Sequence, residues 1–144
     1  MNMAVRHTAA EAAPAIALRQ VAAERDCATG HWSIAWVIEN KNLKRIEILA
    51  VRLPHGKFKS EEHRFAPALQ LEPGASSRFQ LCVSCDEPAG LVTENAFVIF
   101  SVIRSGEALR VFVRLRVVVN PGGKLETATE LITTQKVGFS GVIS

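Results

Sequence analysis

The sequence predicts an all-β fold, a seven-stranded antiparallel β-sandwich, and three observations support this prediction. Apolar and polar residues alternate along several stretches, most regularly over residues 109–119, and a period of two is typical of half-buried strands. Turn-forming residues separate these stretches at nearly regular intervals, for example at residues 72–74 and 105–106. The connections are too short for the crossovers that join parallel strands, so paired strands are expected to be antiparallel.

Three strands are expected in the first part of the chain, over residues 16–21, 31–39 and 43–53. The second is the clearest of the three, because every other residue in it is large and apolar. These residues form its expected core face: Trp32, Ile34, Trp36 and Ile38.

Four strands are expected in the second part, over residues 64–71, 77–83, 96–104 and 108–119. The first of these follows a charged loop at residues 57–62 and contains Pro67, which cannot donate a hydrogen bond to a neighbouring strand. We therefore place it at a sheet edge. The last two strands form a hairpin around Ser105-Gly106.

These strands divide the chain into three parts. Residues 1–13 are expected to form a flexible tail, because they are rich in alanine and polar residues. Residues 14–119 form the sandwich, and residues 120–144 form a C-terminal tail that could add a strand. A chain of 144 residues is consistent with one domain that buries a full apolar core.

Composition and charge argue against several classes of function. The formal net charge is +3 and the lysines and arginines are scattered, so nucleic acid is not indicated as a partner. No apolar stretch approaches the ~18 residues of a membrane span, and the N-terminal residues lack the apolar segment of a signal peptide. The three cysteines form no obvious disulfide framework. The protein is therefore expected to be cytoplasmic, unless an export signal has been removed, and not to bind a membrane.

The chain carries no catalytic signature. It lacks the Gly-x-Ser-x-Gly motif of serine hydrolases, the His-Glu-x-x-His motif of zinc proteases and the Gly-x4-Gly-Lys-Ser/Thr loop that binds phosphate. The glycines and lysine of residues 120–124 lack the spacing and the hydroxyl of such a loop, and a turn explains them. We therefore expect a protein that is not an enzyme and has no cofactor. An unrecognised enzyme, with its site assembled from scattered residues, is the third hypothesis.

The segment LEPGASSRFQLCV, residues 71–83, resembles the Leu-x-Pro-Gly-x-x-x-x-Phe-x-Leu-x-Val segment of bacterial immunoglobulin-like and fibronectin-like sandwich domains. The matching residues are Leu71, Pro73, Gly74, Phe79, Leu81 and Val83. The number and order of strands expected over about residues 15–119 agree with that superfamily, although the Cys…Trp…Cys pattern typical of antibody domains is absent, since no cysteine pair brackets the tryptophans of the second strand. The resemblance implies an immunoglobulin-like β-sandwich with a binding role, and it carries over no functional residue.

The pair Cys82-Val-Ser-Cys85 is one candidate site. In a sandwich whose strands alternate in direction, this pair lies at the same end as Cys27 and His31. Their spacing is compatible with a zinc site formed by Cys27, His31, Cys82 and Cys85. A redox role, a Cys27–Cys85 disulfide and inert thiols that pack as small apolar groups are the alternatives. A small metal- or thiol-dependent module is therefore the second functional hypothesis.

The last hairpin is the other candidate site. If Ser105-Gly106 is a two-residue turn, Arg104 lies opposite Glu107 and one face of the hairpin points away from the core. This outer face combines apolar side chains with guanidinium groups: Phe97, Ile99, Ile103, Arg110, Phe112, Arg114 and Arg116. A three-residue loop would instead turn Phe97 inward, and the C-terminal tail could cover the face.

Large apolar groups framed by arginines are typical of protein interfaces. The first functional hypothesis is therefore a non-catalytic interaction or structural module. It would bind a protein partner, or a second copy of itself, through the outer face of its last hairpin.

Overall fold

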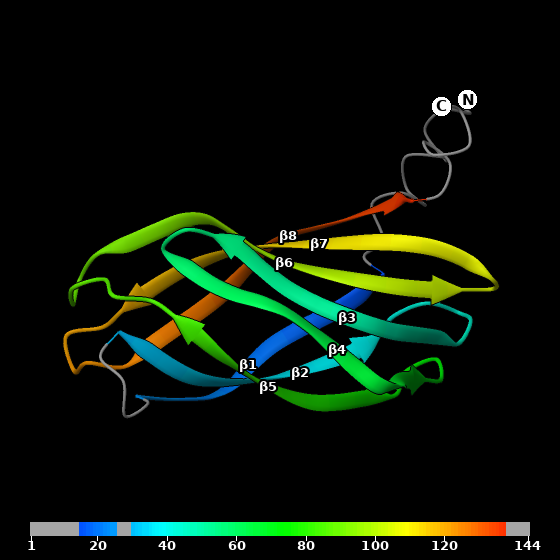
Figure 1. Ribbon diagram of the computed structural model, residues 1–144, viewed down its shortest axis with the longest axis horizontal. Coiled ribbons are helices and arrows are strands. Elements are labelled where there is room, and N and C mark those ends of the chain that lie inside the picture. The colour runs from blue at the N-terminus through cyan, green and yellow to red at the C-terminus, as the bar shows by residue number, and fades with distance from the viewer. Residues whose placement is uncertain (1–14, 26–29, 138–144) are drawn as a thin grey trace.

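The computed structural model describes residues 15–25 and 30–137, and in this part of the chain all the regular elements are β-strands (Figure 1). In chain order the strands are β1 (Ile16–Arg25), β2 (His31–Asn40), β3 (Ile46–His55), β4 (Phe58–Leu71), β5 (Ser76–Ser84), β6 (Val92–Arg104), β7 (Glu107–Val119) and β8 (Leu125–Lys136). All paired strands are antiparallel. The predicted all-β antiparallel fold is thus confirmed. Within the described ranges no helix has the length and apolar character needed to cross a membrane.

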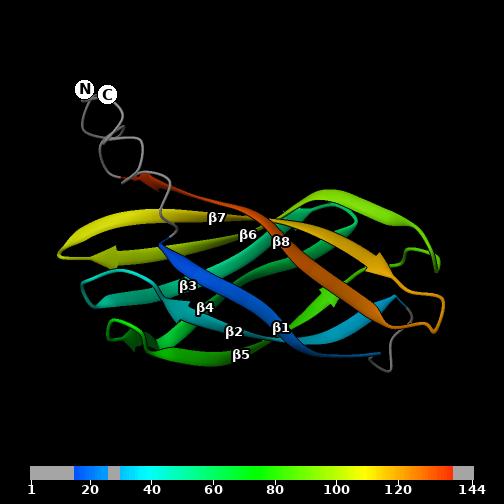
Figure 2. The same cartoon turned by 180° about the vertical axis from the view of Figure 1, so that it is seen from behind.

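The eight strands form one sheet in the order β1-β2-β5-β4-β3-β6-β7-β8. The sheet curls until its two edge strands, β1 and β8, lie side by side, so that it forms a nearly closed barrel (Figure 2). The prediction of a seven-stranded sandwich is therefore wrong in strand number and in closure. Two features explain the difference: β8 extends the sheet beyond β7, and Lys59 of β4 pairs with Ser84 of β5. That single pair joins strands that a sandwich would keep in separate layers.

Alternate residues of the strands fill the interior of the barrel. The four residues of the predicted core face of β2 are at most 2% exposed, which confirms the alternation read from the sequence. Trp36 lies among aromatic rings, stacked on Phe79 with centroids 5.7 Å apart and edge to face with Phe58 at 6.4 Å. These contacts link β2, β5 and β4 through side chains, where the backbone ladder between β4 and β5 is minimal.

The bounds of β3 and β4 differ from the prediction. β3 begins at Ile46 rather than at Leu43, which is 96% exposed. The charged loop expected at residues 57–62 is instead mostly the first part of β4. Its charged residues are tolerated because they lie exposed on a strand that pairs with β3 along one side only, apart from the single pair with β5. The predicted edge position of this strand is wrong, because β4 lies between β5 and β3 in the sheet, although a single pair joins it to β5. Pro67 falls where the β3–β4 ladder is interrupted, as proline requires in an inner strand.

The segment after β7 turns back and pairs with it. The β7–β8 ladder extends from the pair Val119–Leu125 to the pair Leu109–Lys136. The described part of the expected C-terminal tail is therefore an edge strand with its preceding turn. The expected N-terminal tail, residues 1–13, lies outside the described residues.

Candidate functional site

The turn between β6 and β7 has the geometry on which the predicted outer face depends. Ser105 and Gly106 have φ angles of 52° and 77°, and a positive φ at both central residues is the condition for a type I′ turn. Arg104 pairs with Glu107 across the turn. The predicted two-residue turn is therefore confirmed, and the register that would turn Phe97 inward does not occur.

Phe97 and Phe112 form the aromatic centre of the outer face. Their rings meet edge to face with centroids 6.5 Å apart, which is a favoured arrangement for aromatic pairs. Both side chains are half-buried, as is that of Ile103. Ile99 is only 7% exposed, because it lies between Arg52 of β3 and Phe112 of β7. Of the predicted apolar residues, Ile99 therefore offers the least surface to a partner.

The three predicted arginines have different electrostatic surroundings. Arg116 Nε lies 3.4 Å from a carboxylate oxygen of Glu94, and Arg114 Nε lies 4.0 Å from one of Glu130. The second distance is too long for a hydrogen bond, and Arg114 Nε is buried without an acceptor in the described part of the protein. Arg110 is exposed and forms no ion pair with any described residue. Because exposed ion pairs contribute little to stability, Arg114 and Arg116 can exchange their carboxylates for those of a partner.

β8 enlarges the outer face and does not cover it. Its residues Leu131 and Thr133 lie beside Arg114 and Phe112 of β7, and Leu131 is 49% exposed. Sequence reasoning did not place Leu131 or the carboxylate of Glu130 on this face. No regular alternation of apolar and polar residues predicts this strand, because residues 129–136 are polar or exposed except for half-buried Ile132. Only the pairing of β8 with β7 places these residues.

The structure describes three of the four residues of the predicted cysteine site, and it pairs His31 with Ser84, which lies between Cys82 and Cys85 in the chain. Cys82 is exposed, whereas Cys85 is 3% exposed and its amide donates to the carbonyl of Gly30 at 2.8 Å. His31 is half-buried and starts β2. Cys27 lies outside the described residues. No three histidine, cysteine or acidic residues come together as metal ligands in the described ranges.

The chemistry of Cys85 is that of a thiol packed in an apolar environment. Burial raises its pKa above the usual value of 9.0, and the negative charges of Glu87 and Asp86 raise it further, while a backbone hydrogen bond at Glu87 acts in the opposite direction. A raised pKa keeps the thiol protonated at neutral pH. Metal ligation and thiol exchange both need the thiolate, so the structure offers no support for a reactive role of Cys85.

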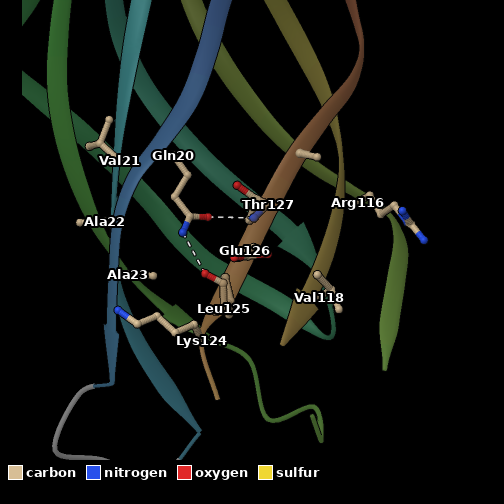
Figure 3. A pocket seen from close by; sticks show the side chains of 11 residues that line it. Gln20, Val21, Ala22, Ala23, Arg116, Val118, Lys124, Leu125, Glu126 and Thr127 are labelled. Carbon is tan, nitrogen blue, oxygen red and sulfur yellow. Dashed lines mark hydrogen bonds between the residues drawn. The ribbon is translucent and has the colours of Figure 1, made fainter. Parts of the chain in front are cut away.

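The edges β1 and β8 meet along a seam that is bridged by side chains (Figure 3). Gln20 Nε2 donates to the carbonyl of Leu125 at 2.9 Å, and the amide of Thr127 donates to Gln20 Oε1 at 2.9 Å. The Thr129 hydroxyl donates to the carbonyl of Leu18 at 3.1 Å. The Gln20 carboxamide thus makes the two hydrogen bonds that a peptide group of a neighbouring strand would make.

An open groove of about 610 Å³ lies across one part of this seam. It is lined by residues 20–23 of β1, by Lys124 and residues 125–128 at the start of β8, and by Arg116 and Val118 of β7. The lining contains no histidine, cysteine or serine, so it provides neither a nucleophile of these types nor an imidazole base. The groove therefore lacks the side chains with which serine and cysteine hydrolases attack their substrates.

Comparison with known proteins adds no assignment at this point, since no protein-family model and no curated protein sequence matches the chain. The functional argument therefore depends on the geometry of the outer face, the seam and the strand edges.

Proposed function

We propose that this protein is a non-catalytic interaction module that binds a protein partner through the outer face of the β6–β7 hairpin. The observation that carries the proposal is the Phe97–Phe112 pair, whose rings lie outside the barrel core. Leu131 continues this apolar surface onto β8, and three arginines lie around it. Burying one large apolar side chain contributes roughly 1.5–3 kcal/mol, so a few such contacts supply the centre of an interface.

The strand order supports an immunoglobulin-like relationship as part of this proposal. β1, β2 and β5 are neighbours on one side of the Lys59–Ser84 link, and β3, β6 and β7 are neighbours on the other. Immunoglobulin-like domains separate their first, second and fifth strands from their third, sixth and seventh strands in the same way. In this interpretation β8 is an addition to that arrangement, and it closes the barrel.

The surface charges support a protein partner rather than nucleic acid or a membrane. Several basic side chains of the sheet lie beside carboxylates, as Arg116 does beside Glu94 and Lys136 beside Glu107. A phosphate-binding surface would need unpaired positive charge gathered on one face. We also propose the cytoplasm as the compartment, since the protonated Cys85 thiol and the odd cysteine number are compatible with reducing conditions.

The variant Phe112→Glu tests the outer face directly. Its side chain is half-buried outside the core, so the variant is expected to keep its fold while losing at least tenfold in partner affinity, equivalent to about 1.4 kcal/mol. Gln80→Glu is the matched control, because it adds the same charge at an exposed position of β5.

Immobilised wild type and both variants are compared for the proteins that they capture from the source cell, and their melting temperatures are compared in parallel. The proposal predicts that Phe112→Glu alone loses the captured partner. Equal capture by all three folded proteins would reject the outer face as the binding surface.

A further inference from the structure

Two arginines of the outer face receive a carboxylate from the chain itself. Glu94 and Glu130 lie in bulges of β6 and β8, the strands that flank β7 on its two sides. A bulge re-aims side chains out of the regular alternation. Glu94 lies 3.4 Å from Arg116, and Glu130 lies 4.0 Å from Arg114. Both carboxylates are thus placed on the part of the outer face that is remote from the β6–β7 turn.

Arg110, the outer-face arginine of β7 nearest the turn, has no such carboxylate. It is exposed and forms no ion pair with any residue in the described ranges. The next charged residues across β6 are Glu47 and Arg52 of β3, which are opposite in sign and lie two strands away from β7. The diagonal neighbours of Arg110 on this face carry no charge: Ile99, Ile103 and Thr133. The guanidinium group of Arg110 therefore lacks a nearby counter-charge.

The residues directly beside Arg110 can help to hold an anion. Ser101 of β6 and Gln135 of β8 are its partners in the two ladders, so a hydroxyl and a carboxamide lie on either side of the guanidinium group. Both can donate a hydrogen bond. A guanidinium group binds a carboxylate with two parallel hydrogen bonds. This row of the outer face therefore presents donors from three adjacent strands to one carboxylate.

Apolar residues lie on both sides of this row. On the same face of β7, Ala108 and Phe112 are two positions before and after Arg110, and their partners on β6 are Ile103 and Ile99. An ion pair that forms between apolar groups is shielded from water, which strengthens its electrostatic attraction. The outer face near the turn thus alternates apolar, cationic and apolar along β7.

We propose that the partner presents to this surface an extended segment in which one acidic residue has an apolar residue two positions before it and another two positions after it. Side chains on one face of a strand repeat about every 6.8 Å, twice the rise per residue, and an extended segment has the same repeat. When its carboxylate meets Arg110, its apolar side chains fall beside Ala108 and Phe112. The pattern reads alike in both chain directions, so it holds for a parallel or an antiparallel segment.

This inference rests on the proposed function, because it names the chemistry of the partner that the same outer face selects. A carboxylate fits the surface better than the phosphates of a single-stranded nucleic acid, which bind along continuous positive charge. A phosphate chain that extended past Phe112 would meet Glu130 and Glu94 beside the next two arginines. A single guanidinium group without a counter-charge matches a single acidic side chain.

Selection from random peptides of about nine residues, displayed on phage, tests this preference without assuming a partner. The wild type is compared with Arg110→Glu and with Arg78→Glu, which reverses the same charge at an exposed arginine of β5 that has no ion pair in the described part of the chain. The wild type and Arg78→Glu should select an acidic residue between apolar residues, and Arg110→Glu should select a basic residue in its place. The acidic pattern on Arg110→Glu, or no pattern on the wild type, would overturn the proposal.

The peptide that the wild type selects most strongly then measures the contribution of Arg110. Fluorescence anisotropy gives its dissociation constant at about 50 and about 300 mM salt. Arg110→Gln should weaken binding about tenfold at the lower salt concentration and reduce its dependence on salt, because ions screen the lost pair of charges. Arg78→Gln is the matched control and should bind within about twofold of the wild type. An equal loss of affinity in both variants would show that the general positive charge of the protein, and not Arg110, attracts the peptide.

Phe112→Glu distinguishes a failure of this inference from a failure of the proposed function. If the peptide binds Phe112→Glu as well as the wild type, the outer face is not the binding surface and both are rejected. If Phe112→Glu loses the peptide while Arg110→Gln and Arg110→Glu retain it, the outer face stands and the acidic segment is rejected. A labelled single-stranded oligonucleotide that binds the wild type more tightly than the peptide, and binds Arg110→Gln weakly, would assign the face to nucleic acid and reject the inference as well.

Discussion

Gln20 shows how one side chain can replace part of a β-ladder. Val21 is an extra residue in the pairing of β1 with β2, and Gln20 lies directly before this bulge. Its carboxamide reaches the edge of β8 and satisfies one donor and one acceptor there. A partly buried edge that lacks such a partner would carry unsatisfied backbone groups, each of which costs free energy. Gln20 therefore stabilises the closed form of the barrel.

The variant Gln20→Ala should lower the free energy of unfolding by about 1–3 kcal/mol, because two hydrogen bonds of about 0.5–1.5 kcal/mol each are lost. Gln80→Ala is the control, since Gln80 also donates from its carboxamide, but on an exposed surface, to the hydroxyl of Ser33. Urea unfolding followed by tryptophan fluorescence measures both variants. Equal stability of the two would show that the seam is not held by the Gln20 carboxamide.

Cys85 gives the protein a pH dependence at alkaline pH. Because the pKa of the folded thiol is raised above 9.0 by burial, the unfolded chain loses its proton at a lower pH than the folded chain. The contribution of Cys85 to stability is therefore complete below about pH 9 and is lost as the pH rises through the folded pKa.

We expect the free energy of unfolding of the wild type to fall more steeply above pH 9 than that of Cys85→Ala, and denaturant titrations at a series of pH values measure the difference. In the folded wild type a thiol reagent should modify exposed Cys82 faster than Cys85. Parallel pH curves for the wild type and Cys85→Ala would contradict the proposed burial of the neutral thiol.

At the scale of elements, prediction succeeded where local chemistry determines the structure. The alternation in β2 and the Ser105-Gly106 turn each need only neighbouring residues for their interpretation. It failed for the first part of β4 and gave β8 only as a strand that the C-terminal tail could add, because exposed polar residues occupy both faces there and hide the period of two. Those strands form because their backbone groups pair with β3 and β7. Their own residues do not indicate this pairing, since it depends on strands elsewhere in the chain. The same reason explains why the outer face was predicted without Leu131 and Glu130.

Two glycines provide a direct test of the β6–β7 turn. A Cβ at Gly106 or at Gly56 would meet no atom within 4 Å, but only Gly106 has a positive φ, at 77°. Gly106→Ala should therefore cost roughly 1–2 kcal/mol of unfolding free energy through the left-handed backbone alone, whereas Gly56→Ala should be nearly neutral. Thermal melting of both variants measures this. If they have the same melting temperature, the strain attributed to the turn is absent.

At the scale of the whole molecule, the barrel has two weak joints. One is the Lys59–Ser84 pair, where the ladder between β4 and β5 is minimal, and the other is the side-chain seam between β1 and β8. The sequence could not predict either joint, because each joins residues that are remote in the chain and carries no local pattern. The aromatic contacts of Trp36 with Phe58 and Phe79 cross the first joint, and the indole of Trp36 donates to the Thr127 hydroxyl, 3.3 Å away, near the second.

The seam between β1 and β8 also determines when the barrel can close during synthesis of the chain. Gln20 contacts residues 105 and 107 positions later in the chain, and Leu18 contacts a residue 111 positions later. Domains fold as the chain emerges, N-terminal parts first, at about 5–20 residues per second. One edge of β1 therefore remains unpaired for several seconds after its synthesis, while β2 can already pair with its other edge. A ribosome-associated chaperone that recognises unpaired strands would encounter this protein with its first strand exposed.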